Sequence, residues 1–256
     1  MTNERRVIVH DNIDALAWSV TARFYTKLTD ILDEQDVAHI ALTGGNVGTR
    51  VLQNIASSPS KAGVDWTRVH FWWSDERFVP RASEERNEGG ARVALLDHLD
   101  VPEENIHPMP STDDFDDLDA AAEAYAAELA EHAWEDTPYP PFDITLLGVG
   151  PDGHVASLFP DKSGVLVRDR VVIAVRNSPK PPPERLSLTL PVINASKRVW
   201  MVLSGTDKAS ALGLALAGAE LAEVPVAGVK GRKRTVFFVD RDAARDVPEN
   251  LFLSAY

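Results

Sequence analysis

The chain has 256 residues, of which 44% are hydrophobic and 25% charged, a composition typical of a globular protein with a sizeable core. Its formal net charge of −13 argues against nucleic acids and anionic membranes as partners, because those surfaces bind clustered Lys and Arg. The absence of cysteine excludes disulfides and thiolate chemistry. No signal segment or run of about 18 apolar residues is present, so we expect a cytoplasmic protein.

Short apolar runs alternate along the chain with segments of helical periodicity. The predicted strands are 7–10, 37–42, 69–73, 144–147, 171–175, 199–203 and 236–239. The predicted helices are 13–32, 47–55, 84–99, 117–134 and 207–216. This alternation predicts an α/β fold with a mostly parallel central sheet and helices on both faces. The Pro-rich segment 177–183 is expected to be a flexible insert, and no linker divides residues 1–256, so we expect a single domain.

Four polar or Gly-rich loops follow predicted strands. In open parallel sheets, ligands bind beyond the carboxyl ends of the strands, so we expect these loops to line one edge. They are TGGN (43–46), SDERFVP (74–80), GVGPDGH (148–154) and SGTDK (204–208).

The third loop contains GVGPDG, which matches the G-x-G-x-x-G fingerprint of dinucleotide-binding proteins. That fingerprint requires an acidic residue at the end of the next strand, but Asp169 precedes the strand at 171–175. Asp152 would also repel a pyrophosphate. The loop is better explained as catalytic: His154 can exchange a proton near neutral pH, and Asp152 can orient its imidazole. The alternative is structural, with Asp152 and His154 capping a following helix.

The remaining loops carry candidate anion-binding residues. Gly44 and Gly45 allow close approach to a ligand, and the following helix offers unpaired N–H groups. Lys208 in the first turn of a helix opposes the helix dipole, which a bound anion would explain, and Arg185 is a second candidate cation. The alternative for either cation is an ordinary surface charge. Arg77 can bind a carbonyl or an anion, or simply pair with Asp75.

Other reaction classes lack support in the sequence. The seven histidines are scattered and show no H-x-x-x-H or H-E-x-x-H spacing, so we expect no metal site. Neither Ser157 nor Ser204 lies in a G-x-S-x-G motif, which argues against a serine-triad hydrolase.

Five segments together resemble the glucosamine-6-phosphate isomerase/6-phosphogluconolactonase family. They are ALTGGN, WWSDERFVP, LLGVGPDGHVASLFP, PPPERLSLTLP and SGTDKASAL, in the family's order. The segments DER and ASLFP resemble the lactonase branch, whereas the deaminase branch typically carries DEY. One departure is TGGN, where the family commonly has SGGS or SGGT, and this leaves the side-chain contacts of Thr43 and Asn46 open.

The resemblance implies a modified Rossmann-like fold that hydrolyses 6-phospho-D-glucono-1,5-lactone to 6-phosphogluconate in the oxidative pentose phosphate pathway. It implies no cofactor and no metal. His154 would activate a water molecule. The other implied catalytic residues are Asp152, Arg77 and Asp75. The implied phosphate-binding residues are Gly44, Gly45, Asn46, Arg185 and Lys208.

Alternatives remain within and outside this family. A deaminase/isomerase acting on an amino-sugar phosphate would release ammonia, and a non-catalytic sugar-phosphate sensor would keep only the phosphate site. A nicotinamide enzyme using GVGPDG is a third alternative. The expected partner is a small sugar phosphate lactone, and the oligomeric state, monomer or dimer, is left open.

Overall fold

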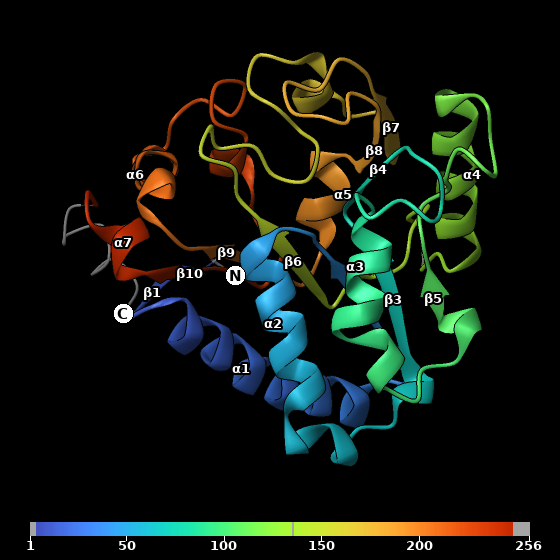
Figure 1. The fold of residues 1–256 in the computed structure, drawn as a ribbon, viewed down its shortest axis with the longest axis horizontal. Helices are drawn as coiled ribbons and strands as arrows, with labels where there is room; N and C mark the ends of the chain where they lie inside the picture. The colour runs from blue at the N-terminus through green and yellow to red at the C-terminus, as the bar shows by residue number, and fades with distance from the viewer. Residues whose placement is uncertain (1–3, 135, 248–256) are drawn as a thin grey trace.

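Seven parallel strands form the central sheet (Figure 1). In the computed structural model, which describes residues 4–134 and 136–247, their order is β1-β10-β9-β6-β2-β3-β5. The strands are β1 (Glu4–His10), β2 (Ala38–Leu42), β3 (Val69–Trp73), β5 (Ile106–His107), β6 (Ile144–Gly148), β9 (Arg198–Leu203) and β10 (Arg234–Asp240). The apolar runs of β2 and β3 are buried almost throughout, as expected for parallel strands covered on both faces.

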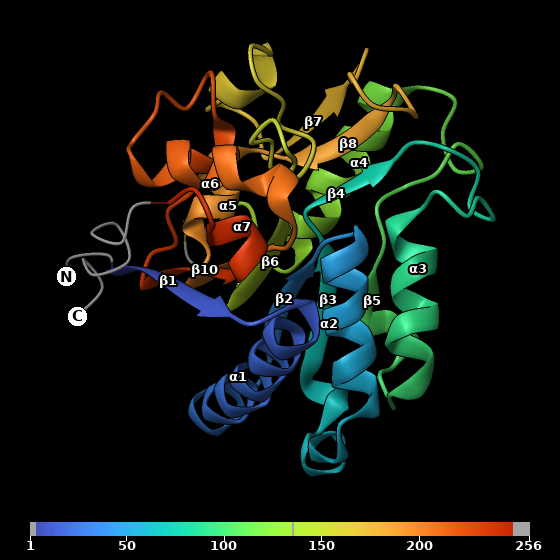
Figure 2. The same ribbon diagram turned by 60° about the vertical axis from the view of Figure 1, so that its left-hand side comes forward.

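Helices cover both faces of this sheet (Figures 1 and 2). On one face lie α1 (Ile13–Glu34), α2 (Asn46–Ser57) and α3 (Asn87–Ala94). On the other face lie α4 (Leu118–Glu131) and α5 (Leu190–Ala195). Two short helices, α6 (Ala209–Leu216) and α7 (Arg241–Ala244), lie near the β1–β10 side of the sheet. The predicted α/β fold with a mostly parallel, doubly covered sheet is confirmed.

A second, antiparallel sheet lies beside the first, with the order β4-β8-β7. It consists of β4 (Asp75–Arg77), β8 (Arg185–Leu188) and β7 (Val172–Val175). The sequence indicates the strand at 171–175 but neither of its partners, because strands of three and four residues carry too little periodicity. This small sheet matters for the site, since its register places Arg77 opposite Arg185.

Three helix predictions need correction at their ends. The predicted helix 117–134 is helical over Leu118–Glu131. The predicted helix 84–99 is α-helical only over Asn87–Ala94 and continues as a 3-10 turn at Leu96–His98. The predicted helix 207–216 begins at Ala209, because Thr206–Lys208 form a 3-10 turn. No helix within residues 4–134 and 136–247 is both long and apolar enough to cross a membrane.

The strand order reverses between β2 and β6, which are neighbours in the sheet. On one side of this pair the order continues to β3 and β5, and on the other to β9, β10 and β1. Such a reversal opens a crevice at the carboxyl ends of the strands, where open α/β sheets bind ligands. The loops after β2 and β6 meet there.

Candidate active site

A cavity of about 290 Å³ lies where the four predicted loops meet. An adjoining cavity of about 300 Å³ shares its Gly44, Gly45 and Lys208 wall and includes Asn46. The walls of the first cavity come from the segments after β2, β6 and β9, from β4 and β8, and from the start of α3. Its predicted site residues are Gly44, Gly45, Asp75, Arg77, His154, Arg185 and Lys208. The expectation that these loops meet at one edge is therefore confirmed.

His154 and Asp152 form a hydrogen-bonded pair on the loop after β6. The imidazole Nδ1 lies 2.5 Å from the Asp152 Oδ1. The loop is tightly turned, since the Gly150 N–H donates to the His154 carbonyl at 2.9 Å and Gly153 has a φ of +81°. An ionised carboxylate can only accept, so Nδ1 is the donor, and in the neutral ring Nε2 then carries the free lone pair. The imidazole also packs against Phe159, with ring centroids 4.7 Å apart.

Asp152 is ionised because of its neighbours. Partial burial by itself would raise the pKa of this carboxyl group, but the hydrogen bond with His154 and the positive charges of His154 and Lys180 outweigh it. Together they lower the pKa of Asp152 to about 2. The Lys180 Nζ lies 3.9 Å from the carboxylate. Asp152 therefore carries its negative charge at neutral pH and can stabilise a protonated imidazole.

The two alternative explanations of this loop do not fit the structure. Residues 149–162 form turns and isolated bridges, so Asp152 and His154 cap no helix there. The dinucleotide fingerprint requires a helix that begins at the glycines, and the same residues provide none. The loop thus places His154 in the cavity wall, with Asp152 hydrogen-bonded behind it.

The second predicted loop contributes Arg77 to the cavity wall, while Asp75 has a supporting position. Asp75 is buried, and its Oδ2 accepts a hydrogen bond from the Ser157 hydroxyl at 2.7 Å. This contact ties β4 to the segment that follows His154. The Arg77 side chain donates to the Glu85 carbonyl instead of pairing with Asp75.

Glu76, which lies between Asp75 and Arg77 in β4, is fully buried and holds this strand in place. Its carboxylate accepts the backbone N–H groups of Arg77, Asn87 and Glu88 at 2.7–2.8 Å and lies 3.8 Å from the Arg86 guanidinium. Burial raises the pKa of Glu76 above its ordinary value, against the opposing effect of Arg86 and these three N–H groups. The carboxylate thus fixes both β4 and the start of α3.

Replacing this carboxylate should destabilise the protein strongly. Glu76→Ala removes the nearest carboxylate from the buried Arg86 guanidinium and the acceptor from three N–H groups, which we expect to lower the free energy of unfolding by about 3–5 kcal/mol. Urea denaturation followed by circular dichroism measures this change. The exposed Glu84 offers a matched control, since Glu84→Ala should change stability by less than about 0.5 kcal/mol. Equal effects of the two substitutions would contradict the structural role of Glu76.

Positively charged side chains also line the cavity. Arg185 is buried, donates to the carbonyls of Lys180 and Pro181 at 3.0 Å, and lies over the Phe159 ring. Burial lowers the pKa of Arg185 from its ordinary value. Because β4 and β8 are paired in register, the Arg77 and Arg185 backbones are direct neighbours. Two guanidinium groups placed together favour an anionic ligand.

The other wall of the cavity combines a helix N-terminus with Lys208. Gly45 precedes α2 with a φ of +84°, a conformation that favours glycine. A Cβ at Gly44 would lie 1.9 Å from the Asn87 Oδ1, so any larger residue would displace the Asn87 side chain from its bond to the Asp75 carbonyl. Lys208 caps the start of α6 and pairs with Asp207 at 2.9 Å. Backbone N–H groups and an ammonium side by side can hold a phosphate.

The model of the family described as glucosamine-6-phosphate isomerases/6-phosphogluconolactonase matches residues 11–238. The chain belongs to this family.

Relatives in the family cover most of the chain. A 6-phosphogluconolactonase of Streptomyces coelicolor is 43% identical over 98% of each chain. One of Mycobacterium tuberculosis is 48% identical over 82% of this chain and 85% of its own. The solved 6-phosphogluconolactonase of Thermotoga maritima is 28% identical, with a TM-score of 0.81 over 93% of this chain and all of its own.

Sequence reasoning missed three residues of this site. Asn87 and Lys180 line the cavity, and Ser157 bonds to Asp75. Asn87 lies in a segment predicted as ordinary helix, and Lys180 lies in the Pro-rich insert. The polar run ERNEGG (85–90) inside that predicted helix is a signal that could have indicated Asn87.

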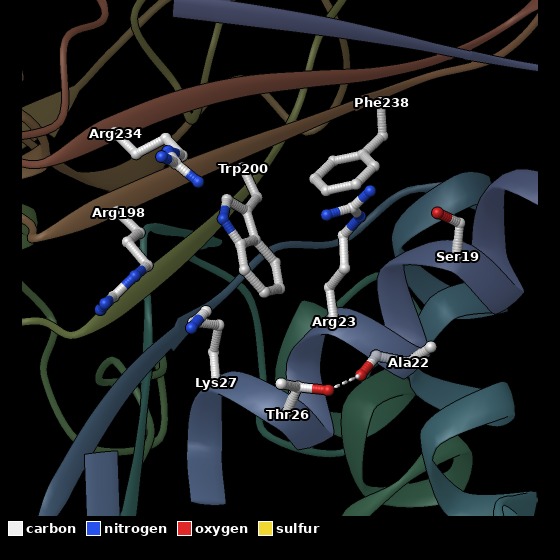
Figure 3. A pocket seen from close by; sticks show the side chains of 9 residues that line it. All are labelled: Ser19, Ala22, Arg23, Thr26, Lys27, Arg198, Trp200, Arg234 and Phe238. Carbon is white, nitrogen blue, oxygen red and sulfur yellow. Dashed lines mark hydrogen bonds between the residues drawn. The ribbon is translucent and has the colours of Figure 1, made fainter. Parts of the chain in front are cut away.

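A separate cavity of about 350 Å³ lies between α1 and strands β9 and β10 (Figure 3). Its cationic residues include Arg198 and Arg234, which begin β9 and β10. It therefore opens at the amino ends of these strands, whereas His154 lies beyond the carboxyl ends. We do not assign it to the candidate active site.

Proposed function

We propose that this family member hydrolyses 6-phospho-D-glucono-1,5-lactone to 6-phosphogluconate in the oxidative pentose phosphate pathway. The observation that carries the proposal is one cavity whose wall contains both His154, which is hydrogen-bonded to Asp152, and a set of cations. The cations are Arg77, Lys180, Arg185 and Lys208. An imidazole–carboxylate pair suits activation of water, and the cations suit a phosphate. The names of the similar proteins from Streptomyces and Mycobacterium agree with this function.

The phosphate would bind at an anion-binding subsite. The residues that build it are Gly44, Gly45, Asn46, Lys208 and Arg185. The amides at the start of α2 and the two side chains would supply charge-assisted hydrogen bonds. Holding the phosphate in this way would place the lactone carbonyl beside the imidazole, because both lie along the same cavity.

The His154 Nε2 would then take a proton from a water molecule as its oxygen attacks the lactone carbonyl carbon. The carbonyl oxygen gains the negative charge of a tetrahedral intermediate. Arg77 or N–H groups of the 148–153 loop would stabilise that charge. Each well-placed donor lowers the activation free energy by roughly 3 kcal/mol. The intermediate collapses with cleavage of the bond to the ring oxygen, which receives the proton from His154. Asp152 would orient the imidazole throughout, and Asp75 would hold the wall through Ser157.

No cofactor or metal enters this proposed reaction, because an ester carbonyl is electrophilic enough for an activated water. A cytoplasmic location, a single domain over residues 1–256 and the absence of nucleic-acid or membrane partners belong to the same proposal. Ammonia release from glucosamine 6-phosphate tests the deaminase alternative. A sensor without activity would show neither lactone consumption nor ammonia release.

The phosphate subsite can be tested by removing one cation. Lys208→Met should lower kcat/KM for the phosphorylated lactone about 10- to 100-fold, since a hydrogen bond from a charged group contributes about 1.5–3 kcal/mol. We expect most of this change in KM. Hydrolysis of unphosphorylated glucono-1,5-lactone should be nearly unchanged, because that substrate has no group for Lys208 to bind. Lys233→Met at an exposed position is the matched control. Equal losses for both lactones would rule out a phosphate contact.

A further inference from the structure

Four of the seven histidines gather on one face of the central sheet, far from His154 in the fold. They are His39, His70, His107 and His132. The prediction that the histidines are scattered is wrong for these four. They are not close in sequence, and no H-x-x-x-H spacing marks them. The pairing register of three neighbouring strands brings them together.

That register follows from the sheet. His39 on β2 is paired with His70 on β3, and Trp72 on β3 is paired with His107 on β5. Side chains two residues apart on a strand point to the same face, so His70 and Trp72 share one face. His132 is the C-cap of α4 and brings its ring over this face. His39 and His70 lie near the amino ends of their strands, opposite the candidate active site.

Three of these rings present nitrogen atoms to one another. One ring nitrogen of each of His70, His107 and His132 lies within 4.8 Å of the others. The His70 Nδ1 and the His107 Nε2 are 3.0 Å apart. Three nitrogens around a tetrahedral zinc ion, each about 2.05 Å from it, lie about 3.4 Å from one another. Modest rotation of the His132 ring at the helix end would complete that geometry.

The surroundings orient these rings as metal sites do. The Glu128 carboxylate bonds to the His107 Nδ1 at 2.8 Å, which turns the Nε2 toward His70. Histidine ligands commonly carry such a carboxylate on their second nitrogen, which fixes the ring. Trp72 stacks on His107 with centroids 3.8 Å apart, and its indole N–H donates to His39. His107 is therefore held between a carboxylate and an aromatic ring.

The His70 Nδ1 and the His107 Nε2 share a hydrogen bond, and because the His107 Nδ1 donates to Glu128, the proton in it belongs to His70. A metal ion at this position would replace that proton. Neutral imidazole is the form that binds metals. His70 and His132 are half-buried, so an ion and a water molecule can reach them.

We propose that His70, His107 and His132 bind one divalent transition-metal ion of the zinc class, with Glu128 orienting His107. Imidazole ligands favour zinc, copper, nickel or cobalt over magnesium and calcium. A water molecule would fill the remaining coordination position. The ion would tie the edge strand β5 to β3 and to the end of α4. This site is independent of the proposed lactonase reaction.

Cobalt is the first probe, because Co²⁺ bound by three imidazoles absorbs visible light strongly. The full-length protein, freed of metal with a chelator, is titrated with Co²⁺ and then with Zn²⁺. We expect a visible band that saturates at one ion per chain and disappears when Zn²⁺ displaces the Co²⁺. Zn²⁺ should also raise the Tm, because an ion that binds only the folded state stabilises it.

Variants separate this site from other histidines. His132→Ala should abolish the band and the Tm increase, and Glu128→Gln should weaken Zn²⁺ binding about 10- to 100-fold. Three control variants should bind Co²⁺ and Zn²⁺ as the unmodified protein does. They are His98→Ala, His154→Asn and Glu123→Gln, the last on the exposed side of α4. Circular dichroism shows whether each variant is folded, and lactone hydrolysis gives a second check for every variant except His154→Asn. A missing band in the unmodified protein, or unchanged Zn²⁺ affinity in folded His132→Ala or Glu128→Gln, would overturn the proposal.

Discussion

His154→Asn is expected to lower kcat for lactone hydrolysis by about 10²- to 10⁴-fold, the usual contribution of a general base. The asparagine amide has a similar size and can still donate to Asp152, so the loop should keep its conformation. It cannot accept a proton from water, because it lacks the free lone pair of the His154 Nε2. Steady-state kinetics at constant pH, with the buffer rate subtracted, give the ratio directly.

Two controls make that result specific. The exposed His98 ring bonds to the Val93 carbonyl and does not line the cavity, so His98→Asn should leave kcat unchanged. The urea midpoints of His154→Asn and the unmodified protein should agree, because the imidazole packs against one ring at the cavity wall. A kcat of His154→Asn within a factor of about two of the unmodified protein would remove the general base from the mechanism.

Gly150→Ala is the second substitution with a large expected effect. A Cβ at this position would lie 2.0 Å from the His154 Nδ1 and 2.4 Å from the Asp152 Oδ1. Both atoms belong to side chains that can rotate away, so the added methyl group should displace the pair without unfolding the protein. A displacement of about 1 Å at reacting groups can lower the rate about 10²-fold, and we expect a loss of at least this size in kcat.

The matched control is Gly213→Ala in α6, where an added Cβ meets no atom within 4 Å. It should leave activity unchanged and stabilise the helix slightly, since alanine favours helices over glycine. Kinetics and urea denaturation are measured for both variants. A fully active Gly150→Ala would show that the observed His154–Asp152 geometry is not needed for the reaction.

The parts of this protein that the sequence predicts well are those with local causes. The apolar runs of β2 and β3 alternate with amphipathic segments, which is enough to indicate a parallel sheet and the loops at its edge. His154 and Asp152 are two residues apart, so their contact also needs no tertiary information.

The features that the sequence does not predict depend on strand pairing and contacts between segments that are distant in the sequence. Arg77 and Arg185 become neighbours through two very short strands whose periodicity is too brief to recognise. Glu76 lies inside the predicted loop SDERFVP, but its role depends on burial against the start of α3. The histidine group depends on sheet register, which fixes side-chain neighbours and has no signature in residue spacing.

The central claim is that this chain hydrolyses a phosphorylated lactone with His154 as the base. The most direct measurement follows acid release at constant pH from freshly generated 6-phosphogluconolactone, with the unmodified protein, His154→Asn and buffer alone in parallel. Our account predicts clear acceleration over buffer by the unmodified protein, and a rate close to buffer for His154→Asn. Acceleration that survives in the variant would contradict the mechanism, and an unmodified protein no faster than buffer would contradict the function.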